Sequence, residues 1–441
     1  MTSRHLHRRN GTIFIASIWV LIALAGAAIV LAQTMMVETH CSFNQLDEAR
    51  AFSVQQAAIQ YVLAAVTDFD GRLDDDELEV EAVGVADGFF WIIRNSGLGG
   101  EIEFGITDET GKINLNAAPA FVLENLPGMT PDLASALLTW RGDGSEADQA
   151  DTQYYLLRDP PYICKQSPFE TVEELLLVRD FTPEMLFGRD INRNGIIDEH
   201  ELRETSGLGT IGDEWLDRGL YPFVTVYSTG SGTGDDELLN VNSAQSERIH
   251  EVLESVLTDE RLSTVAENTR NRRPFQNVVH YYLESGMTMD EFHEVAHLLT
   301  TGQNQRLQVN LNTAAAGVLQ CLPGLDQADV AALLQWRATN SMNIQSVAWV
   351  TEVLGREKAI GIGEYITTTS WQYSADVLSV SATGRAMRRC RVVIDASREE
   401  PRIVYFQDAT ALGWPLAREI LEEVKSGNLQ QQAHQGFVGV R

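Results

Sequence analysis

An uncharged apolar run near the N-terminus constrains this chain more than any other feature. Thr12 to Ala32 reads TIFIASIWVLIALAGAAIVLA, 21 residues without a charged side chain. At about 1.5 Å per residue, a helix of this length crosses a hydrocarbon core of about 30 Å. Arg4, Arg8 and Arg9 precede the run, and no Lys or Arg follows it until Arg50. Because basic residues stay on the cytoplasmic side, we expect a cytoplasmic N-terminus and everything after about residue 35 outside.

Three explanations compete for this run. A cleaved secretory signal has a shorter apolar region that ends in small residues, whereas a plain single-span anchor needs nothing special at its start. Here a short basic leader ends at Gly11, and the helical pattern continues past the run into SFNQLDEARAF. This pattern resembles the class III signals of type IV pilins and pseudopilins, which are cleaved after the Gly and keep the apolar helix. The resemblance implies processing between Gly11 and Thr12 by a prepilin peptidase and methylation of the new N-terminus; a plain anchor is the alternative.

The fifth residue of such a processed chain is Ala16. In most pilin-like proteins this residue is Glu, whose carboxylate can neutralise the N-terminal amine of the adjacent subunit in the filament. A carboxylate inside a membrane is costly unless it is paired, so its absence fits a subunit with no neighbour above it. Among pseudopilins, the K subunit of type II secretion departs in this way, and IASIWVLIAL resembles its usual start.

The composition describes a folded and strongly acidic chain. Its 441 residues include 62 Asp and Glu against 33 Lys and Arg, a formal net charge of -29. Such a charge repels nucleic acid and favours divalent cations, so DNA is not an expected partner. The cysteines stand far apart without a CxxC pair, so neither a zinc knuckle nor a redox motif is expected. Four cysteines allow three disulfide connectivities and the sequence selects none of them: Cys41, Cys164, Cys321 and Cys390.

Beyond the apolar run, the residue pattern changes from helix to strand and later returns to strand. Helical spacing continues to about residue 69, and short β-branched or aromatic segments separated by Gly turns follow from Glu77 to Thr107. We predict an α+β, pilin-like fold, in which a long N-terminal transmembrane helix packs on a small antiparallel sheet and a large helical domain is inserted. The predicted divisions are the cytoplasmic leader 1–11, the transmembrane and extended helix 12–70, the first part of the sheet 71–111, the helical insertion 112–370, the late strands 371–410 that complete the sheet, and a polar tail 411–441. The tail contains an amphipathic piece, LAREILEEVK.

An internal repeat organises the insertion. Ile113 to Arg141 aligns without a gap with Val309 to Arg337, with 15 identities in 29 positions, and a fainter copy begins at Leu239. Each copy starts with Asn-Leu-Asn or Asn-Val-Asn, which we expect to form an Asx turn or helix cap. In the two closer copies, Leu-Pro-Gly forms a turn between short helices, and the Trp that follows belongs to the core. The predicted repeats, which resemble helix-hairpin-helix units, cover 113–187, 239–300 and 309–365.

The order of these motifs resembles the type II secretion minor pseudopilin K family over nearly the whole chain. The resemblance rests on the leader and apolar run, GKINLNAAP, LPGMTPDLASALLTWR, PPYICKQSPFETVEELLLVRDFTPEMLF and YSADVLSVSATGRAMRRCRVVID. It implies a subunit without enzymatic activity at the tip of the pseudopilus, in the bacterial inner membrane, with its C-terminal domain in the periplasm. The implied partners are the minor pseudopilins I and J, the major pseudopilin, the prepilin peptidase and inner-membrane lipid. The long C-terminal tail departs from the family pattern.

A twelve-residue stretch, DINRNGIIDEHE from Asp190 to Glu201, matches the EF-hand calcium loop. The pattern requires side-chain oxygens at its first, third and fifth positions, a Gly for the sharp turn, a backbone carbonyl, and a bidentate Glu at the end. Two neutral Asn ligands lower the charge of the site and favour a moderate affinity. We therefore predict structural calcium bound by Asp190, Asn192, Asn194, the carbonyl of Ile196, Asp198 and Glu201.

Two other motifs keep alternative functions open. His293-Glu294-Val295-Ala296-His297 is an HExxH string, which on a helix can hold zinc for a metallohydrolase. No convincing third ligand follows it, and Thr300 stands where metzincins have Gly. The Leu-Pro-Gly turns are also found in helix-hairpin-helix DNA-binding proteins, which would suggest a membrane-anchored DNA-uptake receptor. However, Thr130 and Asp326 replace the second backbone glycine of that motif, and the surroundings are acidic.

Overall fold

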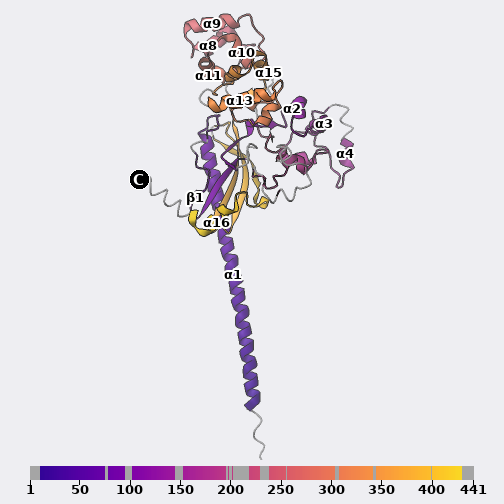
Figure 1. Cartoon of the computed structure of the whole chain (residues 1–441), viewed down its shortest axis with the longest axis vertical. Helices are drawn as coiled ribbons and strands as arrows, with labels where there is room; N and C mark the ends of the chain where they lie inside the picture. The colour runs from indigo at the N-terminus through magenta and orange to yellow at the C-terminus, as the bar shows by residue number, and fades with distance from the viewer. Residues whose placement is uncertain are drawn as a thin grey trace, which may run out of the picture.

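The computed structural model in Figure 1 shows one long N-terminal helix, which we call the stalk, with its second half against a sheet. The inserted domain of short helices, which we call the head, is attached to that sheet. The structure describes residues 10–74, 78–94, 102–144, 152–194, 197, 201, 218–228, 238–254, 256–302, 307–340, 344–398 and 400–429. All four cysteines are free; Cys41 is exposed, and the other three are buried.

The stalk is one continuous helix, α1 (Asn10–Thr67), of 58 residues, about 87 Å long at 1.5 Å per residue. Its second half packs on the sheet through residues at helical spacing, including Ala51, Val54, Ala58 and Val62. The helix ends as predicted just before residue 70, where Asp70 and Gly71 adopt left-handed backbone angles.

The antiparallel sheet joins early and late parts of the chain. Its order is β1 (Val83–Val85), β2 (Gly88–Arg94), β11 (Gln372–Ser381), β12 (Met387–Asp395) and β13 (Arg402–Asp408), with β3 (Glu103–Phe104) beside β2 and β4 (Thr107–Asp108) beside β11. Strands β2 and β11 are neighbours although about 280 residues separate them, with Phe90 opposite Ser379. The predicted pilin-like α+β fold, with late strands completing an early sheet, is confirmed.

The first predicted strand is shorter than expected. The segment LEVEAVGVA, residues 78–86, is expected to be one strand, but β1 spans only Val83–Val85. Ala82 has φ of 51°, a left-handed angle that interrupts an extended strand. A single bond from the Ile92 N–H to the Val80 carbonyl, 2.9 Å, holds the preceding segment against β2.

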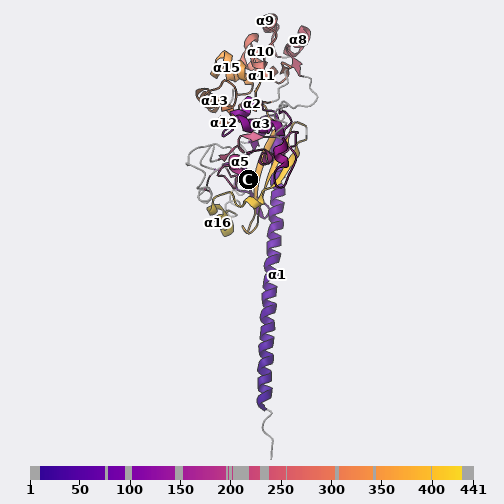
Figure 2. The same cartoon turned by 90° about the vertical axis from the view of Figure 1, so that its right-hand side faces the viewer.

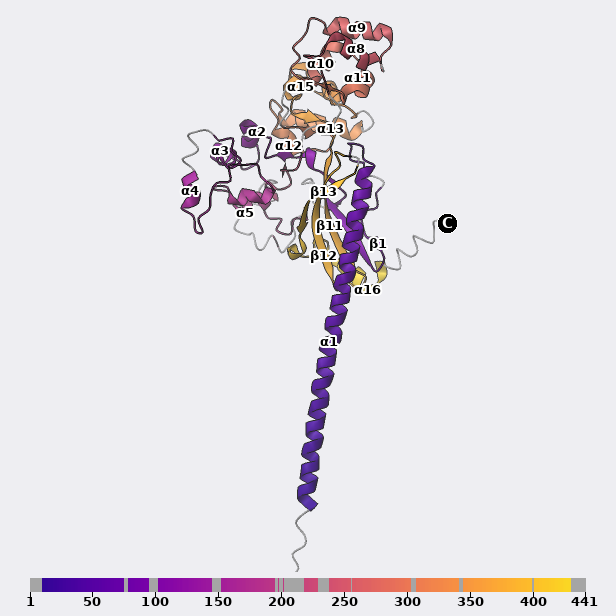
Figure 3. The same ribbon diagram turned by 180° about the vertical axis from the view of Figure 1, so that it is seen from behind.

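The insertion forms three lobes, each closed by a pair of short parallel strands. Those strands are β5 (Ile113–Asn114) with β6 (Val224–Thr225), β7 (Leu239–Asn240) with β8 (Leu299–Thr300), and β9 (Val309–Asn310) with β10 (Ile366–Thr367). We call these the first lobe (113–225), second lobe (239–300) and third lobe (309–367). In Figures 1 and 3 the second lobe lies farthest from the start of α1, the third lies between it and the sheet, and the first projects to one side.

Short helices fill the lobes. The first lobe holds α2 (Ala120–Glu124), α3 (Pro131–Trp140), α4 (Thr152–Leu156), η3 (Val172–Leu177) and α5 (Pro183–Phe187). The second holds α8 (Ser246–Glu254), α9 (Asp259–Thr269), α10 (Val278–Ser285) and α11 (Met289–Ala296). The third holds α12 (Ala316–Gln320), α13 (Gln327–Thr339), η5 (Val347–Trp349), α14 (Val350–Val353) and α15 (Arg356–Ile362).

The C-terminal segment, predicted as a polar tail with an amphipathic piece LAREILEEVK, has a helix at that piece. η6 (Thr410–Leu412) and α16 (Arg418–Ser426) follow the sheet, and Figure 2 shows the sheet between α1 and α16. Leu416 and Val424 are buried against the face that α1 leaves open, and the Trp414 ring meets Trp91 edge-on at 6.1 Å. The few apolar residues among many polar ones cover the second face of the sheet, because only one side of this short helix needs to be apolar.

Candidate functional site

The first half of α1 is a bare apolar surface. Its large side chains from Ile13 to Val37 are all exposed; Trp19, for example, is 68% exposed. The first buried residue along the helix is Asp47. Among the described residues, α1 is the one helix that is long and apolar enough to cross a membrane. Ala16 lies within this exposed part, so α1 offers a hydrocarbon surface to lipid or to other helices and no carboxylate at that position.

The repeated Asn residues form the turns that the sequence predicted. Asn114, Asn240 and Asn310 each accept a hydrogen bond from the backbone N–H two residues later, at 2.8–3.0 Å. The second Asn of each motif ties the start of its lobe to a later segment. Asn116 donates to the Phe169 carbonyl and accepts from its N–H, and Asn242 does the same with Phe275.

The arginines that follow the repeated tryptophans also have a structural role. Arg141 donates to the carbonyls of Leu115 and Ala118, and Arg337 donates to those of Leu311 and Ala314. Each guanidinium therefore closes the turn that begins its own repeat. These bonds support the structural interpretation of the repeated residues.

A buried charged cluster joins the head to the sheet. Glu109, in the 3-10 turn η1 (Glu109–Gly111), is fully buried. Its carboxylate accepts from Lys112 Nζ at 2.7 Å, Arg391 Nη2 at 3.0 Å and Ser374 Oγ at 2.5 Å. It also accepts from the Thr225 hydroxyl in the first lobe. Burial alone would raise the pKa of Glu109, but the charges of Lys112 and Arg391 and these hydrogen bonds lower it to about 2.

The neighbouring carboxylate, Asp108, holds the third lobe. It accepts from Asn310 Nδ2 at 2.8 Å and Thr313 Oγ1 at 2.6 Å, and also from the Ser370 hydroxyl. Burial raises the pKa of Asp108, although its hydrogen bonds oppose this effect. Two consecutive acids thus bind two different lobes to the sheet.

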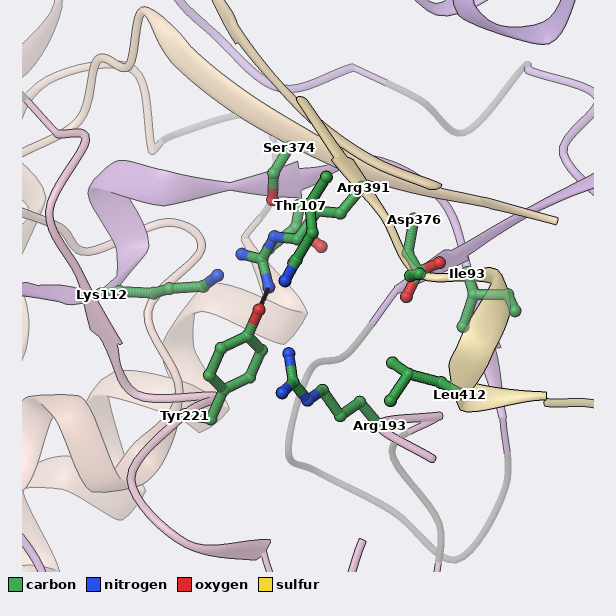
Figure 4. Close-up of a pocket in the computed structure, with 11 residues that line it drawn as sticks. Ile93, Thr107, Lys112, Arg193, Tyr221, Ser374, Asp376, Arg391 and Leu412 are labelled. Atoms are coloured by element: carbon green, nitrogen blue, oxygen red, sulfur yellow. Dashed lines mark hydrogen bonds between the residues drawn. The ribbon is translucent and has the colours of Figure 1, made fainter. Parts of the chain in front are cut away.

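A small cavity lies beside this cluster. Figure 4 shows Lys112, Arg391 and Tyr221 pointing toward one another, with Arg193 approaching from another side. The cavity holds about 30 Å³, which is enough for a water molecule, since about 10–15 Å³ suffices. The Arg391 Nη1 donates to the Tyr221 hydroxyl at 2.5 Å. A space of this size between buried polar groups suits a bridging water rather than a substrate.

The predicted calcium loop begins directly after α5 and lies against the sheet. Asp190, Asn194 and Glu201 are buried, and the Glu201 carboxylate accepts from the Asn192 N–H at 2.9 Å. The Asn194 N–H donates to Asp190 and to Asn192, both at 3.0 Å. The loop thus folds back so that its twelfth position meets its third. These four residues fit the oxygen-rich ligand set of a hard cation; Ile196 and Asp198 lie outside the described residues.

Two contacts tie this loop to the rest of the protein. Arg389 on β12 is fully buried, pairs with Asp376 at 2.5 Å, and donates to the carbonyls of Asn192 and Arg193. Asn194 Nδ2 donates to the Pro415 carbonyl at 2.7 Å, in the segment that leads into α16. The conformation of the loop is therefore coupled to the sheet and to the C-terminal segment.

The family model described as "Type II secretion system (T2SS), protein K" matches residues 121–187, which run from α2 to the end of α5 in the first lobe. Over these residues the chain is similar to the protein K family. The resemblance drawn from the sequence motifs is confirmed for this part of the chain.

The chain is also similar in shape to a chain of the crystal structure of the GspK-GspI-GspJ complex from the type 2 secretion system of enterotoxigenic Escherichia coli. The TM-score is 0.41 with 12% sequence identity, over 83% of this chain and 98% of that chain. No curated protein matches the sequence.

The structure gives no support to the two alternative motifs. His293 and Glu294 lie on α11, and His297 caps that helix. Among the described residues, no group of three His, Cys, Asp or Glu side chains could hold a metal ion. The residues after the Leu-Pro-Gly turns, Thr130 and Asp326, cap α3 and α13 with their side-chain oxygens. These caps occupy backbone N–H groups that could otherwise bind phosphate, and the Asp326 carboxylate would also repel it.

The sequence analysis missed the buried charged cluster around Asp108 and Glu109. The one sequence feature that indicates it is MRRCRVVID, residues 387–395, a predicted strand in which three arginines interrupt the apolar residues. Two of them, Arg389 and Arg391, are the buried partners of the loop and of Glu109. Partners that are distant in the sequence could not be assigned from strand pattern alone.

Proposed function

We propose that this chain acts as a minor pseudopilin at the tip of the type II secretion pseudopilus. There it would start or cap the filament that exports folded proteins across the outer membrane. The observation that carries the proposal is that the two halves of α1 have different surroundings. The first half is exposed and apolar and is available for a helical bundle, whereas the second half packs on the sheet that carries the three lobes. Ala16 leaves no carboxylate that needs a neighbour, and the head would block a further subunit from stacking above. This role is assembly rather than catalysis.

The proposed setting is the bacterial inner membrane. Before processing, α1 spans it once, with Arg4, Arg8 and Arg9 in the cytoplasm and the head in the periplasm. The proposed partners are the minor pseudopilins I and J, the major pseudopilin and inner-membrane lipid. Nucleic acid is not a partner in this proposal, because the net charge of -29 opposes it.

Processing between Gly11 and Thr12 is part of the proposal. A prepilin peptidase would remove residues 1–11 and leave the apolar helix intact, followed by methylation of the Thr12 amine. N-terminal sequencing of the protein isolated from membranes should read TIFIASIWV. An intact leader on protein that never purifies with pilin-like partners would reject the proposal in favour of a plain anchor.

We further propose that the loop 190–201 binds a structural calcium ion. The ligands would be Asp190, Asn192, Asn194, the carbonyl of Ile196, Asp198 and Glu201. The Asp190 and Glu201 carboxylates lie buried beside the Asn192 and Asn194 side chains, and this grouping of oxygen donors in one loop supports the site. With two neutral Asn ligands, we expect a dissociation constant on the order of 10⁻⁴ to 10⁻³ M, as in extracellular modules.

Calorimetry on the full chain in detergent would test the calcium site. Calcium should bind with a stoichiometry of one at this loop and raise the unfolding temperature, and Glu201→Gln should abolish both effects. Glu124→Gln, an exposed acid on α2, is the matched control and should behave as the unmodified chain. Equal calcium stabilisation of the Glu201 variant and the control would remove the site.

A further inference from the structure

The segment 414–429, which we call the C-terminal cover, includes α16 and lies over the second face of the sheet (Figure 2). Pro415 and Leu416 are buried, and so is Val424 on α16. Leu416 and Val424 pack against residues of the strands, among them Trp91. A helix of nine residues is marginal by itself in water. The cover therefore keeps its structure only while it is docked on the sheet.

Apart from these apolar contacts, one hydrogen bond holds the cover in place. Asn194 Nδ2, in the loop 190–201, donates to the Pro415 carbonyl at 2.7 Å. Among the described residues, no other hydrogen bond or ion pair joins residues 414–429 to the rest of the protein. Asn194 is only 1% exposed, so water does not compete for this bond. The position of the cover therefore depends on where the loop holds Asn194.

The same side chain is a proposed calcium ligand. A backbone carbonyl can only accept, so the nitrogen of the Asn194 amide faces Pro415 and its oxygen is directed away from Pro415. Asn194 occupies the fifth position of the loop, where the EF-hand pattern requires a side-chain oxygen. Its backbone N–H donates to Asp190 and to Asn192, both at 3.0 Å, so it lies among the other proposed ligands. One planar amide thus connects the ligand set to the cover.

Arg389 makes a second connection between the loop and the C-terminal segment. Its guanidinium donates to the carbonyls of Asn192 and Arg193 in the loop. Its backbone N–H donates to the Thr410 hydroxyl at 3.1 Å, and its carbonyl accepts from the Ala409 N–H at 2.8 Å. A single residue of β12 therefore holds the backbone of the loop and the start of the segment that leads to the cover.

We propose that calcium in the loop 190–201 and the docked C-terminal cover stabilise each other. When Asn194 is fixed as a ligand, its Nδ2 stays in place for the Pro415 carbonyl. When the cover is docked, that carbonyl fixes the orientation of the amide, as an outer-shell partner does for a metal ligand. The coupling is reciprocal, because each event must raise the affinity of the other by the same factor. The inference rests on the proposed calcium site.

This coupling makes the cover a calcium-dependent device. Without calcium, the cover should open more often and expose the sheet face around Trp91. With calcium, that face should stay closed. The calcium concentration around the head would thus decide how much of the sheet is accessible.

Hydrogen exchange of the full chain in detergent tests the coupling. Saturating calcium should slow exchange of the backbone amides in α16 by about fivefold or more, which is the usual size of coupling between two sites. Exchange in α9 of the second lobe should not change, because that helix contacts neither the loop nor the cover.

Two variants of the loop separate calcium binding from the coupling. Asn194→Asp keeps a side-chain oxygen for calcium but removes the Nδ2 donor to Pro415. Asn192→Asp makes the same change at a ligand that has no hydrogen bond to the cover. Both should bind calcium more tightly than the unmodified chain, because each adds a negative charge to the ligand set. Calcium should no longer slow exchange in α16 of Asn194→Asp, whereas Asn192→Asp should keep the full effect.

Calorimetry measures the reverse effect, that of the cover on calcium affinity. Truncation after Gly413 removes the cover and should weaken calcium binding by about tenfold or more, since loss of an outer-shell partner typically costs about 10- to 100-fold in metal affinity. Truncation after Leu429 keeps the cover and should leave the affinity unchanged.

The outcomes distinguish the coupling from the calcium site itself. Calcium that binds without slowing exchange in α16 would overturn the coupling and leave the proposed site intact. Equal slowing in Asn194→Asp and Asn192→Asp would also overturn it, because the connection would not pass through the Asn194 amide. If no calcium binds, the site and the inference both fail. The two loop variants decide the question even if the chain truncated after Gly413 does not fold.

Discussion

Two adjacent buried carboxylates hold the head on the sheet, and their pKa values move in opposite directions. Burial would raise the pKa of Glu109, but Lys112 and Arg391 outweigh it and lower the value to about 2. For Asp108 burial dominates and raises the pKa, because its partners are neutral hydrogen-bond donors. Glu109 therefore contributes as an anion, whereas the pKa of Asp108 lies above its ordinary value.

The acid dependence of stability should follow from Glu109. Its folded pKa lies below the ordinary value of 4.5, so its ionised form stabilises the fold above about pH 4.5 and this contribution is lost as the pH falls toward 2. Glu109→Gln leaves Lys112 and Arg391 buried without their counter-charge, which costs about 3–5 kcal/mol. In thermal unfolding of the full chain, the variant should melt well below the unmodified protein at pH 7 and lose less stability on acidification.

The pH dependence of stability that Asp108 contributes has the opposite sign to that of Glu109. With a raised folded pKa, its protonated form stabilises the fold at low pH, and that contribution is lost as the pH rises through the folded pKa. Glu124→Gln, which changes an exposed acid, should reproduce the unmodified curve. Parallel acid curves for the Glu109 variant and this control would contradict the assignment.

At the scale of elements, the three lobes share one structural arrangement. An Asn starts the turn, the next Asn fastens a later segment, and a short parallel strand pair closes the lobe. Repetition made this part predictable, because residues that recur at one spacing reveal the turn they form. The same reasoning could not place the charged cluster, because Glu109 and Arg391 lie outside the repeats. They meet Thr225 of the first lobe only when the sheet is complete.

Loss of the second Asn should therefore weaken a lobe as a unit. Asn116→Ala removes two hydrogen bonds to Phe169, at 2.7 and 2.9 Å, and leaves buried backbone groups without partners, a cost of about 1–3 kcal/mol for each group. We expect faster hydrogen exchange across α2 and α3 and little change in the second lobe. Asn242→Ala should give the converse pattern. Uniform loosening of all lobes by either variant would refute their independence.

The amphipathic pattern of LAREILEEVK indicates a helix with one apolar side, but it does not indicate what that side packs against. Burial of Leu416 and Val424 depends on a sheet face whose exposure could not be known before the strand order. Truncation after Gly413 should uncover Trp91 and lower stability by several kcal/mol, at about 1.5–3 kcal/mol for each apolar side chain lost. A red shift of tryptophan fluorescence and a lower unfolding temperature would report this, whereas truncation after Leu429 should leave both unchanged. Equal behaviour of the two truncations would show that α16 adds no stability.

At the scale of the whole molecule, the helical domain is inserted at one point of the sheet. The hydroxyls of Thr110 and Ser370 are 2.8 Å apart, so the two ends of the insertion meet. Strands β4 and β11 are already paired at Thr107 and Ser374, outside that point. The pilin-like body thus has its own core between α1 and the sheet, and its folding does not require the chain to pass through the lobes.

A short Gly-Ser linker in place of residues 112–369 should therefore leave a folded body without a head. The same variant should also carry Asp108→Asn, because the Asp108 carboxylate would no longer accept hydrogen bonds from Asn310 and Thr313. If the head blocks stacking, this body should enter filaments without capping them, and pseudopili should become longer or more variable in length. Removal of the second lobe alone, whose strands β7 and β8 are adjacent at its base, keeps most of the bulk and should preserve filament length. Filaments of normal length from the headless body would show that the head does not prevent another subunit from stacking. Capping would then be a property of α1 and the sheet.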